Sequence, residues 1–389
     1  MDWLAALAAV ALAAWLYLLL GRDGFWRARP RIEDEAPPTP GSWPAVVAIV
    51  PARNEAAHVE AALRSLLAQE YPGDLAVVLV DDHSEDATAA VGRRVAAGQA
   101  RPLAVIGARP LPLGWSGKLW AVAEGLRHAA QIRPGAAHIL LTDADIAHPP
   151  GSLTRLVAKA EAERLDLVSL MVRLRCETFW ERLLIPPFVF FFQKLYPFAA
   201  VNDAGRDTAA AAGGCMLVRR RALEEAGGIA ALRGELIGDV ALARTVKHRP
   251  GGGRIWLGLT ATTNSLRRYD RLAEIWAMVA RSADTQLRHS LARLAGTLVG
   301  MGIAYLIPPL SLLVGVVGGN RWLSGLCLAA WTAMAAAYRP TARLYRLAPP
   351  WLLSLPLAAA LYAAMTVDSA LQHRRGAGGR WKGRVLSPP

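Results

Sequence analysis

The chain has 389 residues, 53% of them hydrophobic and 19% charged, with a mean hydropathy of +0.25 and a net charge of +13. This apolar content predicts membrane segments. The net positive charge is therefore expected to interact with anionic lipid. The sequence contains no nucleic-acid-binding motif, and we expect no nucleic-acid partner. Three widely spaced cysteines support neither a disulfide framework nor a zinc site, and they are typical of a reducing compartment.

Residues 1–21 are predicted to form an uncleaved transmembrane anchor. The run from residue 3 to residue 20 carries no charge and is long enough to cross a bilayer. A secretory signal has its positive charge in front, whereas here the arginines follow the run, at Arg22, Arg27, Arg29 and Arg31. The positive-inside rule therefore places the next segment, a basic and proline-rich linker over 22–45, in the cytoplasm.

The chain then alternates between two patterns. Strand-like runs at 46–50, 75–80, 103–106, 138–141 and 167–172 alternate with helical patterns at 56–69, 88–97, 119–131 and 153–164. This alternation predicts an α/β domain with a mostly parallel sheet. In such sheets ligands bind beyond the carboxyl ends of the strands, where the most polar residues of this chain also occur.

Asp143 and Asp145 follow the fourth strand-like run, one residue apart. Residues i and i+2 of a strand lie on one face, so we expect both carboxylates to point to one place. Two close carboxylates repel unless a cation lies between them, and Mg²⁺ or Mn²⁺ prefer oxygen ligands. The pattern predicts a divalent metal site of the kind that binds a diphosphate; a solvated acidic loop is the alternative.

The segment after the first strand is a further candidate for donor binding. Asn54 is predicted to be the N-cap of the following helix, and the helix N-terminus together with Arg53 favours phosphate. A capping role alone is the other interpretation. The candidate residues here are Pro51, Arg53, Asn54 and Glu55.

Three other places carry candidate site residues. Asp81 or Asp82, after the second strand, can accept a hydrogen bond from a ribose hydroxyl or a base imide. Lys118 ends a glycine-containing loop that suits a diphosphate, although the P-loop spacing is missing. Gly213, Gly214 and Cys215 are the candidate residues of the acceptor side, and they allow close backbone approach, either to a ligand or to a neighbouring helix.

The C-terminal part is predicted to be a membrane region. Residues 179–201 are rich in aromatics, interrupted by Pro186 and Pro187, and suit either a core or an interfacial segment. Region 291–368 holds apolar runs at 294–319, 322–338 and 347–367, of which two or three are membrane segments. The basic tail, 369–389, belongs in the cytoplasm by the positive-inside rule, so we expect 347–367 to form a re-entrant or interfacial hairpin.

Together these motifs resemble the family-2 (GT-A type) glycosyltransferases from Val46 to about Arg288, and we assign 46–290 to this domain. The arrangement looks most like the hopanoid-biosynthesis-associated membrane glycosyltransferases and, more distantly, ceramide glucosyltransferase. The resemblance implies a multi-pass inner-membrane enzyme with a cytoplasmic Rossmann-like domain. It implies inverting transfer from a nucleotide-sugar donor, a UDP-sugar, to a lipid acceptor. Asp81 or Asp82 would read uridine, Asp143 and Asp145 would hold the metal, and Asp239 would be the base.

Two departures from the family pattern matter. Gly238 stands where the family has Glu, so Glu235 is a rival to Asp239 as the base. The Gln/Arg-x-x-Arg-Trp signature of polymer-making relatives is absent, which favours transfer of a single sugar. Two alternatives stay open, namely a polyprenyl-phosphate glycosyltransferase and a catalytically inactive membrane scaffold.

Overall fold

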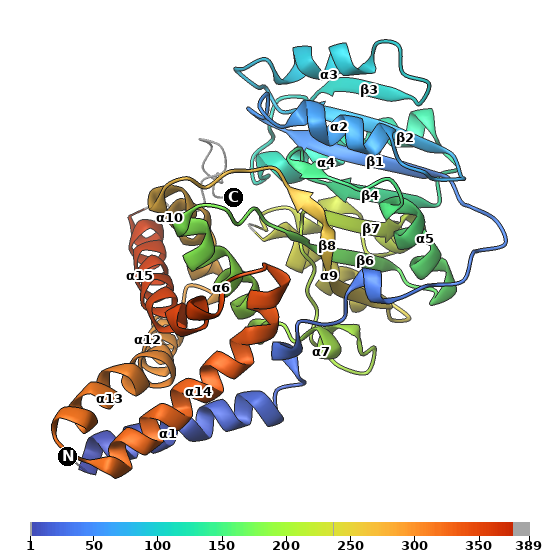
Figure 1. The fold of residues 1–389 in the computed structure, drawn as a ribbon. Coiled ribbons are helices and arrows are strands. Elements are labelled where there is room, and N and C mark those ends of the chain that lie inside the picture. Colours follow the sequence, from blue (N-terminus) through green and yellow to red (C-terminus); the bar gives the residue numbers. More distant parts are fainter. Residues whose placement is uncertain (1, 236, 376–389) are drawn as a thin grey trace. The chain divides into compact units, whose positions relative to one another are not determined.

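The computed structural model describes residues 2–235 and 237–375, which form two compact units (Figure 1). The sheet unit comprises Arg29–Arg175 and Ala200–Arg268. The helical unit comprises residues 2–28, Cys176–Ala199 and residues 269–375. Residues 29–45 of the expected linker group with the sheet unit, and residues 269–290 group with the helical unit.

Within the described ranges the sheet unit has one eight-stranded mixed sheet, in the order β3-β2-β1-β4-β7-β6-β8-β5. Strands β7 and β5 run antiparallel to their neighbours, while β3, β2, β1, β4, β6 and β8 are parallel to one another. The predicted α/β class with a mostly parallel sheet is thus confirmed. The strands are β1 (Val46–Ala52), β2 (Leu75–Asp81), β3 (Leu103–Gly107), β4 (His138–Thr142), β5 (Ile146–Ala147), β6 (Leu167–Arg173), β7 (Cys215–Arg219) and β8 (Ile255–Ser265).

The register of the central strands brings their polar ends to one edge of the sheet. β1 is buried along its whole length, as its run of valine, alanine and isoleucine predicts for a strand covered on both faces. It pairs with β2 from Val46 opposite Leu75 to Ala52 opposite Asp81. On its other side Val46–Ile49 pair with His138–Leu141 of β4. The residues that follow β1, β2 and β4 therefore leave the sheet side by side.

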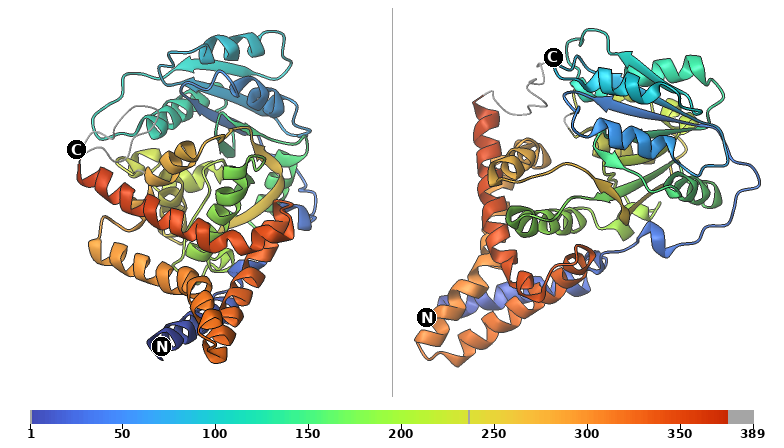
Figure 2. Two further views of the ribbon diagram at one scale, coloured as in Figure 1. Left: turned by 60° about the vertical axis from the view of Figure 1, so that its left-hand side comes forward. Right: turned by 45° about the horizontal axis from the view of Figure 1, so that its top comes forward.

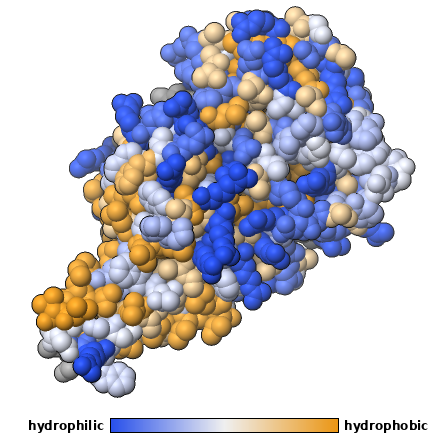
Figure 3. Space-filling model, in the orientation of Figure 1, coloured by the Kyte–Doolittle hydropathy of each residue, from blue (hydrophilic) through white to orange (hydrophobic). Residues whose placement is uncertain are grey.

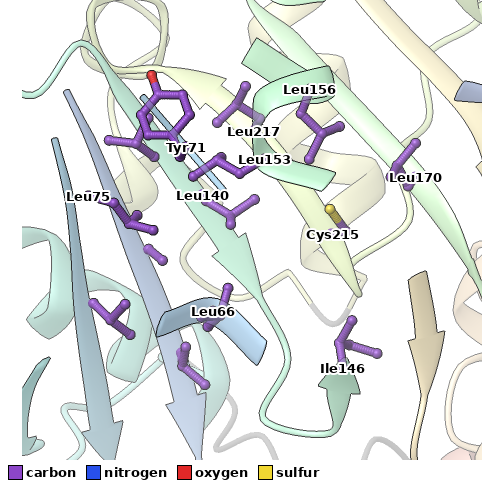
Figure 4. Packing of buried hydrophobic residues seen from close by; sticks show 14 of the residues in the cluster. Leu66, Tyr71, Leu75, Leu140, Ile146, Leu153, Leu156, Leu170, Cys215 and Leu217 are labelled. Carbon is purple, nitrogen blue, oxygen red and sulfur yellow. The ribbon is translucent and has the colours of Figure 1, made fainter. Parts of the chain in front are cut away.

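Helices cover the sheet and close its apolar core. Figure 4 shows this core between the strands and the helices, with side chains such as Leu66, Leu140, Leu156 and Leu217. Burial of each such leucine contributes roughly 1.5–3 kcal/mol. The helices are α2 (Val59–Leu67), α3 (Thr88–Ala96), α4 (Gly117–Ile132), α5 (Ser152–Ala162), α8 (Arg220–Glu225) and α9 (Gly238–Lys247), and α7 (Phe198–Asn202) lies where the chain re-enters this unit.

The helical unit packs around its own aromatic core. Phe190, Tyr305, Met334 and Tyr338 are fully buried there, and the Trp15 indole donates to the carbonyl of Ala304 (2.8 Å). Figure 2 shows α1 and α14 side by side, and these two helices are in contact. The elements are α1 (Asp2–Leu20), α6 (Phe179–Leu195), α10 (Leu272–Ala280), α11 (Ala283–Gln286), α12 (Leu291–Met301), a π-helical turn (Gly302–Leu306), α13 (Ile307–Val317), α14 (Arg321–Leu344) and α15 (Leu355–Arg374).

Two expectations for the helical unit were wrong. The prolines Pro186 and Pro187 do not end a segment but lie inside α6, which begins with a capping box of Thr178 and Glu181. The hairpin expected over 347–367 is not formed, because Leu355–Arg374 is one continuous helix preceded by a short 3₁₀ turn. Pro356 falls in the first turn of α15, where proline is tolerated.

Three helical segments of the described chain are long and apolar enough to cross a membrane. They are Trp3–Leu20, Leu291–Val317 and Pro349–Arg374, whereas the expected run 322–338 lies in α14, which is not among them. The surface over α1, α13 and α14 is largely hydrophobic in Figure 3, with exposed Leu313, Val317 and Trp322. An apolar surface of this extent is typical of contact with lipid.

Candidate active site

Arg53 joins the loops that follow β1 and β2. Its side chain is buried, and Nη1 donates to the carbonyl oxygens of Asp82 (2.6 Å) and His83 (2.8 Å). Nη2 contacts Glu85 at 3.2 Å. The guanidinium that was expected to contact phosphate thus holds the second loop in place. Pro51, the other residue predicted here, is the sixth residue of β1 and pairs with Val80.

Asn54 is not the N-cap that the sequence predicted. The helix begins at Val59 with His58 before it, and Asn54 has a left-handed backbone (φ 52°). Asn54 Oδ1 accepts from the backbone N–H of Glu85 (2.8 Å), and its own N–H donates to Ser84 Oγ (3.0 Å). Asparagine tolerates this backbone region better than most residues. The residue therefore links two loops rather than starting a helix.

The two acids at the end of β2 differ in burial, with Asp81 as the last residue of the strand and Asp82 directly after it. Asp82 is fully buried and lies 3.3 Å from the ring of His83. Asp81 is half-buried, and its Oδ2 accepts from the N–H of Ser84 (3.3 Å). Its Oδ1 is buried and has no hydrogen-bond partner within the described part of the chain. A buried acceptor without a donor is costly, so a ligand N–H or O–H would be favoured there.

Asp143 forms an ion pair with Lys118 at the carboxyl ends of the strands. Lys118 is the second residue of α4, whose N-cap Ser116 accepts from the N–H of Leu119. Its Nζ lies 2.5 Å from Asp143 Oδ1, and about a third of each side chain is exposed (36% and 33%). The lysine predicted for the diphosphate and the first acid of the predicted metal site are thus adjacent.

Asp145 has a different partner, which the sequence analysis did not find. Arg267 Nε donates to Asp145 Oδ2 (2.8 Å), and Arg267 Nη2 donates to Glu55. The chain turns between β4 and β5 instead of continuing as a strand, so the alternation that was expected to aim both acids at one point does not apply. The basic pair Arg267–Arg268, a few residues after the apolar run 255–259, was the available signal for this residue.

The two acids fit a hard divalent cation by donor type. Both offer carboxylate oxygens, and Asp143 is accessible to solvent, whereas the Asp145 side chain is only 10% exposed. In the structure their charges are balanced by the side chains of Lys118 and Arg267. Positive charge therefore stabilises both carboxylates at this end of the sheet.

Asp239 lies at the start of α9, where its carboxylate is held by backbone donors. Oδ2 accepts from the N–H of Gly213 (2.8 Å) and Oδ1 from the N–H of Val240 (2.9 Å). Burial raises the pKa of Asp239, the positive charge of Lys118 opposes this, and the charge of Asp143 adds to the increase. A methyl group on Gly213 would lie 3.1 Å from Asp239 Oδ2 and 3.5 Å from Lys118 Nζ. Gly213, Asp239, Lys118 and Asp143 are therefore neighbours.

The rival acid Glu235 is engaged elsewhere. Its carboxylate pairs with Arg244 at 3.2 Å, and 41% of the side chain is exposed. At Gly238, where the family has Glu, an added Cβ would lie 2.9 Å from Leu119 Cδ2. A side chain at this position would thus require movement of Leu119.

Gly214 and Cys215 differ from Gly213 in their surroundings. The carbonyl of Gly214 accepts from Thr142 Oγ1 (2.8 Å), and a Cβ there would lie 2.9 Å from Val172. The thiol of Cys215 is fully buried among apolar side chains (Figure 4), and burial raises its pKa to about 12. Of the three residues predicted on the acceptor side, Gly213 is the one that contacts the catalytic candidates.

The fold and this cluster of charges define a GT-A type domain. Residues 47–227 match the family model Glycosyl transferase family 2. This match and the sheet topology identify these residues as a glycosyltransferase family 2 domain.

Two solved structures are similar to the chain, and the first of them has the same fold. A mannosyltransferase, PcManGT from Pyrobaculum calidifontis in complex with GDP-Man and Mn²⁺, is similar over 95% of this chain and 99% of its own, with 22% identity and a TM-score of 0.57. Glucosyl-3-phosphoglycerate synthase from Mycobacterium tuberculosis in complex with Mn²⁺, UDP and phosphoglyceric acid is similar over 63% and 78%, with 19% identity and a TM-score of 0.42. No curated protein sequence matches the chain significantly.

Proposed function

We propose that this protein is a membrane-bound, inverting glycosyltransferase that moves a single sugar from a nucleotide-sugar donor to a lipid hydroxyl. The observation that carries the proposal is the cluster in which Asp143, Lys118 and Gly213 of the family 2 domain lie beside Asp239 at the start of α9. It combines a cation and a carboxylate suited to a diphosphate with a second, buried carboxylate suited to accept a proton.

Asp81 is the residue we propose to bind the nucleotide base. Its Oδ1 lacks a donor among the residues described, and the imide N–H of uracil would supply one. We therefore propose a UDP-sugar as the donor. Guanine also offers an N–H to a carboxylate, and the similar mannosyltransferase structure contains GDP-Man, so both nucleotides belong in the test.

Lys118 and the two acids of the Asp143-x-Asp145 motif are proposed to bind the donor diphosphate. Asp143 and Asp145 would hold Mg²⁺ or Mn²⁺, and when bound such an ion neutralises charge that develops on the departing diphosphate. Lys118 adds a mobile positive charge beside Asp143, on the first turn of α4. Arg53 and Asn54 hold the loop that follows Asp81.

Asp239 is proposed to take the proton from the acceptor hydroxyl as its oxygen attacks the anomeric carbon. The N–H groups of Gly213 and Val240 fix the carboxylate, and burial raises its pKa toward the value that suits a base. A single displacement assisted by one base inverts the configuration of the sugar carbon. The proton ends on Asp239, and the nucleoside diphosphate leaves.

The helical unit supports a lipid acceptor. Its exposed apolar surface and three candidate spans suit an enzyme that meets its acceptor in a membrane. The arginines after α1 support a cytoplasmic catalytic domain, and the resemblance in arrangement supports a hopanoid lipid of the inner membrane as the acceptor.

We propose further that α14 returns the chain to the cytoplasmic side and that α15 does not cross the membrane. α14 packs along α1 and α13 and ends in a basic segment with Arg339, Arg343 and Arg346, whereas α15 packs against α6, α10, α11 and α12. Ser387 lies outside the described residues. A cysteine placed there in a cysteine-free variant should not be labelled by an impermeant maleimide in intact cells. Rapid labelling would place the tail outside and contradict this topology.

The function is tested with purified full-length protein in detergent. Tritiated UDP- and GDP-sugars are offered with total lipid extract, with and without hopanoids, and label is followed into the lipid phase. We expect transfer from a UDP-sugar that depends on the hopanoid fraction and is absent in Asp239→Asn. Lipid labelling that persists in Asp239→Asn, or no transfer from any nucleotide sugar, would contradict the proposal.

A further inference from the structure

A second group of metal-ligating side chains lies within the helical unit. Asp284 belongs to α11, His289 precedes α12, and His373 is in the last turn of α15. One donor atom from each residue lies within 4.8 Å of the other two. Two imidazole nitrogens and one carboxylate oxygen, from residues up to 89 positions apart in the sequence, form a donor set typical of transition-metal sites.

The fold holds Asp284 against α15. The backbone N–H of Asp284 donates to Ser369 Oγ (3.0 Å), and Ser369 lies one helical turn before His373, on the same face. On the same stretch of α15, Asp368 accepts from the indole N–H of Trp276 in α10 (2.7 Å). These contacts place the Asp284 carboxylate, which is 6% exposed, beside the end of α15.

An unusual turn directs His289 back to Asp284. Arg288 and His289 both have left-handed backbones, with φ of 52° and 54°. The N–H of His289 donates to the carbonyl of Asp284 (3.1 Å), and its ring Nδ1 lies 2.7 Å from Asp284 Oδ2. Two successive left-handed residues other than glycine are unfavourable by roughly 1–2 kcal/mol each, so other interactions must stabilise this turn.

The two imidazole rings are stacked on each other. Their centroids are 3.9 Å apart, and the ring planes differ by 14°. The rings therefore present their nitrogens side by side, next to the carboxylate of Asp284. Both histidines are exposed, which leaves room for an ion to enter and for water to occupy a fourth position.

We propose that Asp284, His289 and His373 bind a divalent transition-metal ion of the Zn²⁺ class. Zn²⁺ takes nitrogen and carboxylate ligands at about 2.0–2.2 Å in a tetrahedron, which sets the donor atoms about 3.4 Å apart. Because the donor atoms now lie within 4.8 Å of one another, binding requires the exposed His373 side chain to rotate out of the stacked arrangement. The ion links the segment before α12 to the end of α15. This site is separate from the Asp143-x-Asp145 motif, whose oxygen donors suit Mg²⁺ or Mn²⁺.

The test measures binding of Co²⁺, which takes the geometry of Zn²⁺ sites and is visible by its ligand-field absorption. Full-length protein without a histidine tag is stripped with chelator and titrated with Co²⁺, in an Asp145→Asn background that removes a proposed ligand of the other site. We expect one equivalent to bind with a tetrahedral spectrum that Zn²⁺ abolishes. His373→Ala and His289→Gln should each weaken binding by about 10²-fold or more.

His128→Ala serves as the matched control, because His128 lies on α4, outside the cluster, and should bind Co²⁺ as the parent does. His373 is exposed at a helix end, so its substitution is compatible with folding, which circular dichroism verifies. Absence of a tetrahedral Co²⁺ spectrum in the parent would overturn the proposal. So would an unchanged spectrum in the His289→Gln/His373→Ala double variant.

Discussion

Two cation–carboxylate groups at the carboxyl ends of the strands differ in their access to solvent. In the first, Lys118 and Asp143 each expose about a third of the side chain. In the second, Arg267 joins Asp145 and Glu55, whose side chains are about one-tenth exposed. Exposed ion pairs contribute about 0–1 kcal/mol, whereas breaking a buried pair costs several times more. The first pair can therefore open for a ligand at little cost, while the second holds the ends of β1, β4 and β8 together.

Asp239 is coupled electrostatically to the first pair, because the charges of Lys118 and Asp143 both influence its pKa. Asp239→Asn keeps the size of the side chain but cannot accept a proton, so turnover should fall roughly 10²–10⁴-fold while donor binding changes little. Radiolabelled sugar transfer and donor titration measure the two quantities. Glu235→Gln is the matched control and should retain turnover. If Glu235→Gln were inactive and Asp239→Asn active, Glu235 would be the base and the assignment of Asp239 would be wrong.

Substitution of Asp143 tests the exposed pair, and substitution of Asp145 tests the buried group. Both Asp143→Asn and Asp145→Asn should lower turnover by about 10²-fold or more, as expected for loss of a charge-stabilising group. Only Asp145→Asn should also lower the free energy of unfolding, by about 1–3 kcal/mol, because it removes one of the two buried carboxylates that pair with Arg267. Thermal unfolding in detergent tests this, and a larger destabilisation by Asp143→Asn would reverse the comparison.

The smallest expected effect is a shift in pH dependence. Asp239 must be deprotonated to act as a base, so activity is lost as pH falls through its raised pKa. Lys118 lowers this pKa, and Lys118→Met should therefore move the acid limb of kcat/KM to higher pH. Arg244→Met, which removes the partner of Glu235, is the control and should leave the limb in place. An acid limb unmoved by Lys118→Met would show that Lys118 does not act on the base.

The central strands of the sheet and the polar residues at their ends were predictable, because the local pattern of hydrophobic residues determines these strands. The buried runs of β1, β2 and β4 are continuous and rich in valine, leucine and isoleucine, and the acids that follow them, Asp81 and Asp143, lie at the strand ends as expected. Strands β7 and β8 were not predicted, since β7 follows an alanine- and glycine-rich stretch and pairs antiparallel with β4 and β6. Without β8 the position of Arg267 was not apparent.

Other features depend on contacts that no local pattern contains. The local sequence favoured phosphate binding by Arg53. Its actual bonds, to the carbonyls of Asp82 and His83 about 30 residues away, depend on the register of the sheet and could not be predicted from that local sequence. The cluster of Asp284, His289 and His373 likewise requires α11 and α15 to pack together. In α6 the fold overrides the usual effect of proline, because the capping box and packing around Phe190 stabilise the helix.

The most direct measurement is calorimetric titration of UDP-sugar into the full-length protein in detergent, with Mn²⁺ and with excess chelator. We expect binding to wild type only with the metal, strong weakening in Asp143→Asn, and unchanged affinity in Asp239→Asn. This pattern would place donor and metal at the exposed pair and separate them from the base. Equal affinity in chelator, or in Asp143→Asn, would contradict the assignment of this end of the sheet to a metal-bound nucleotide sugar.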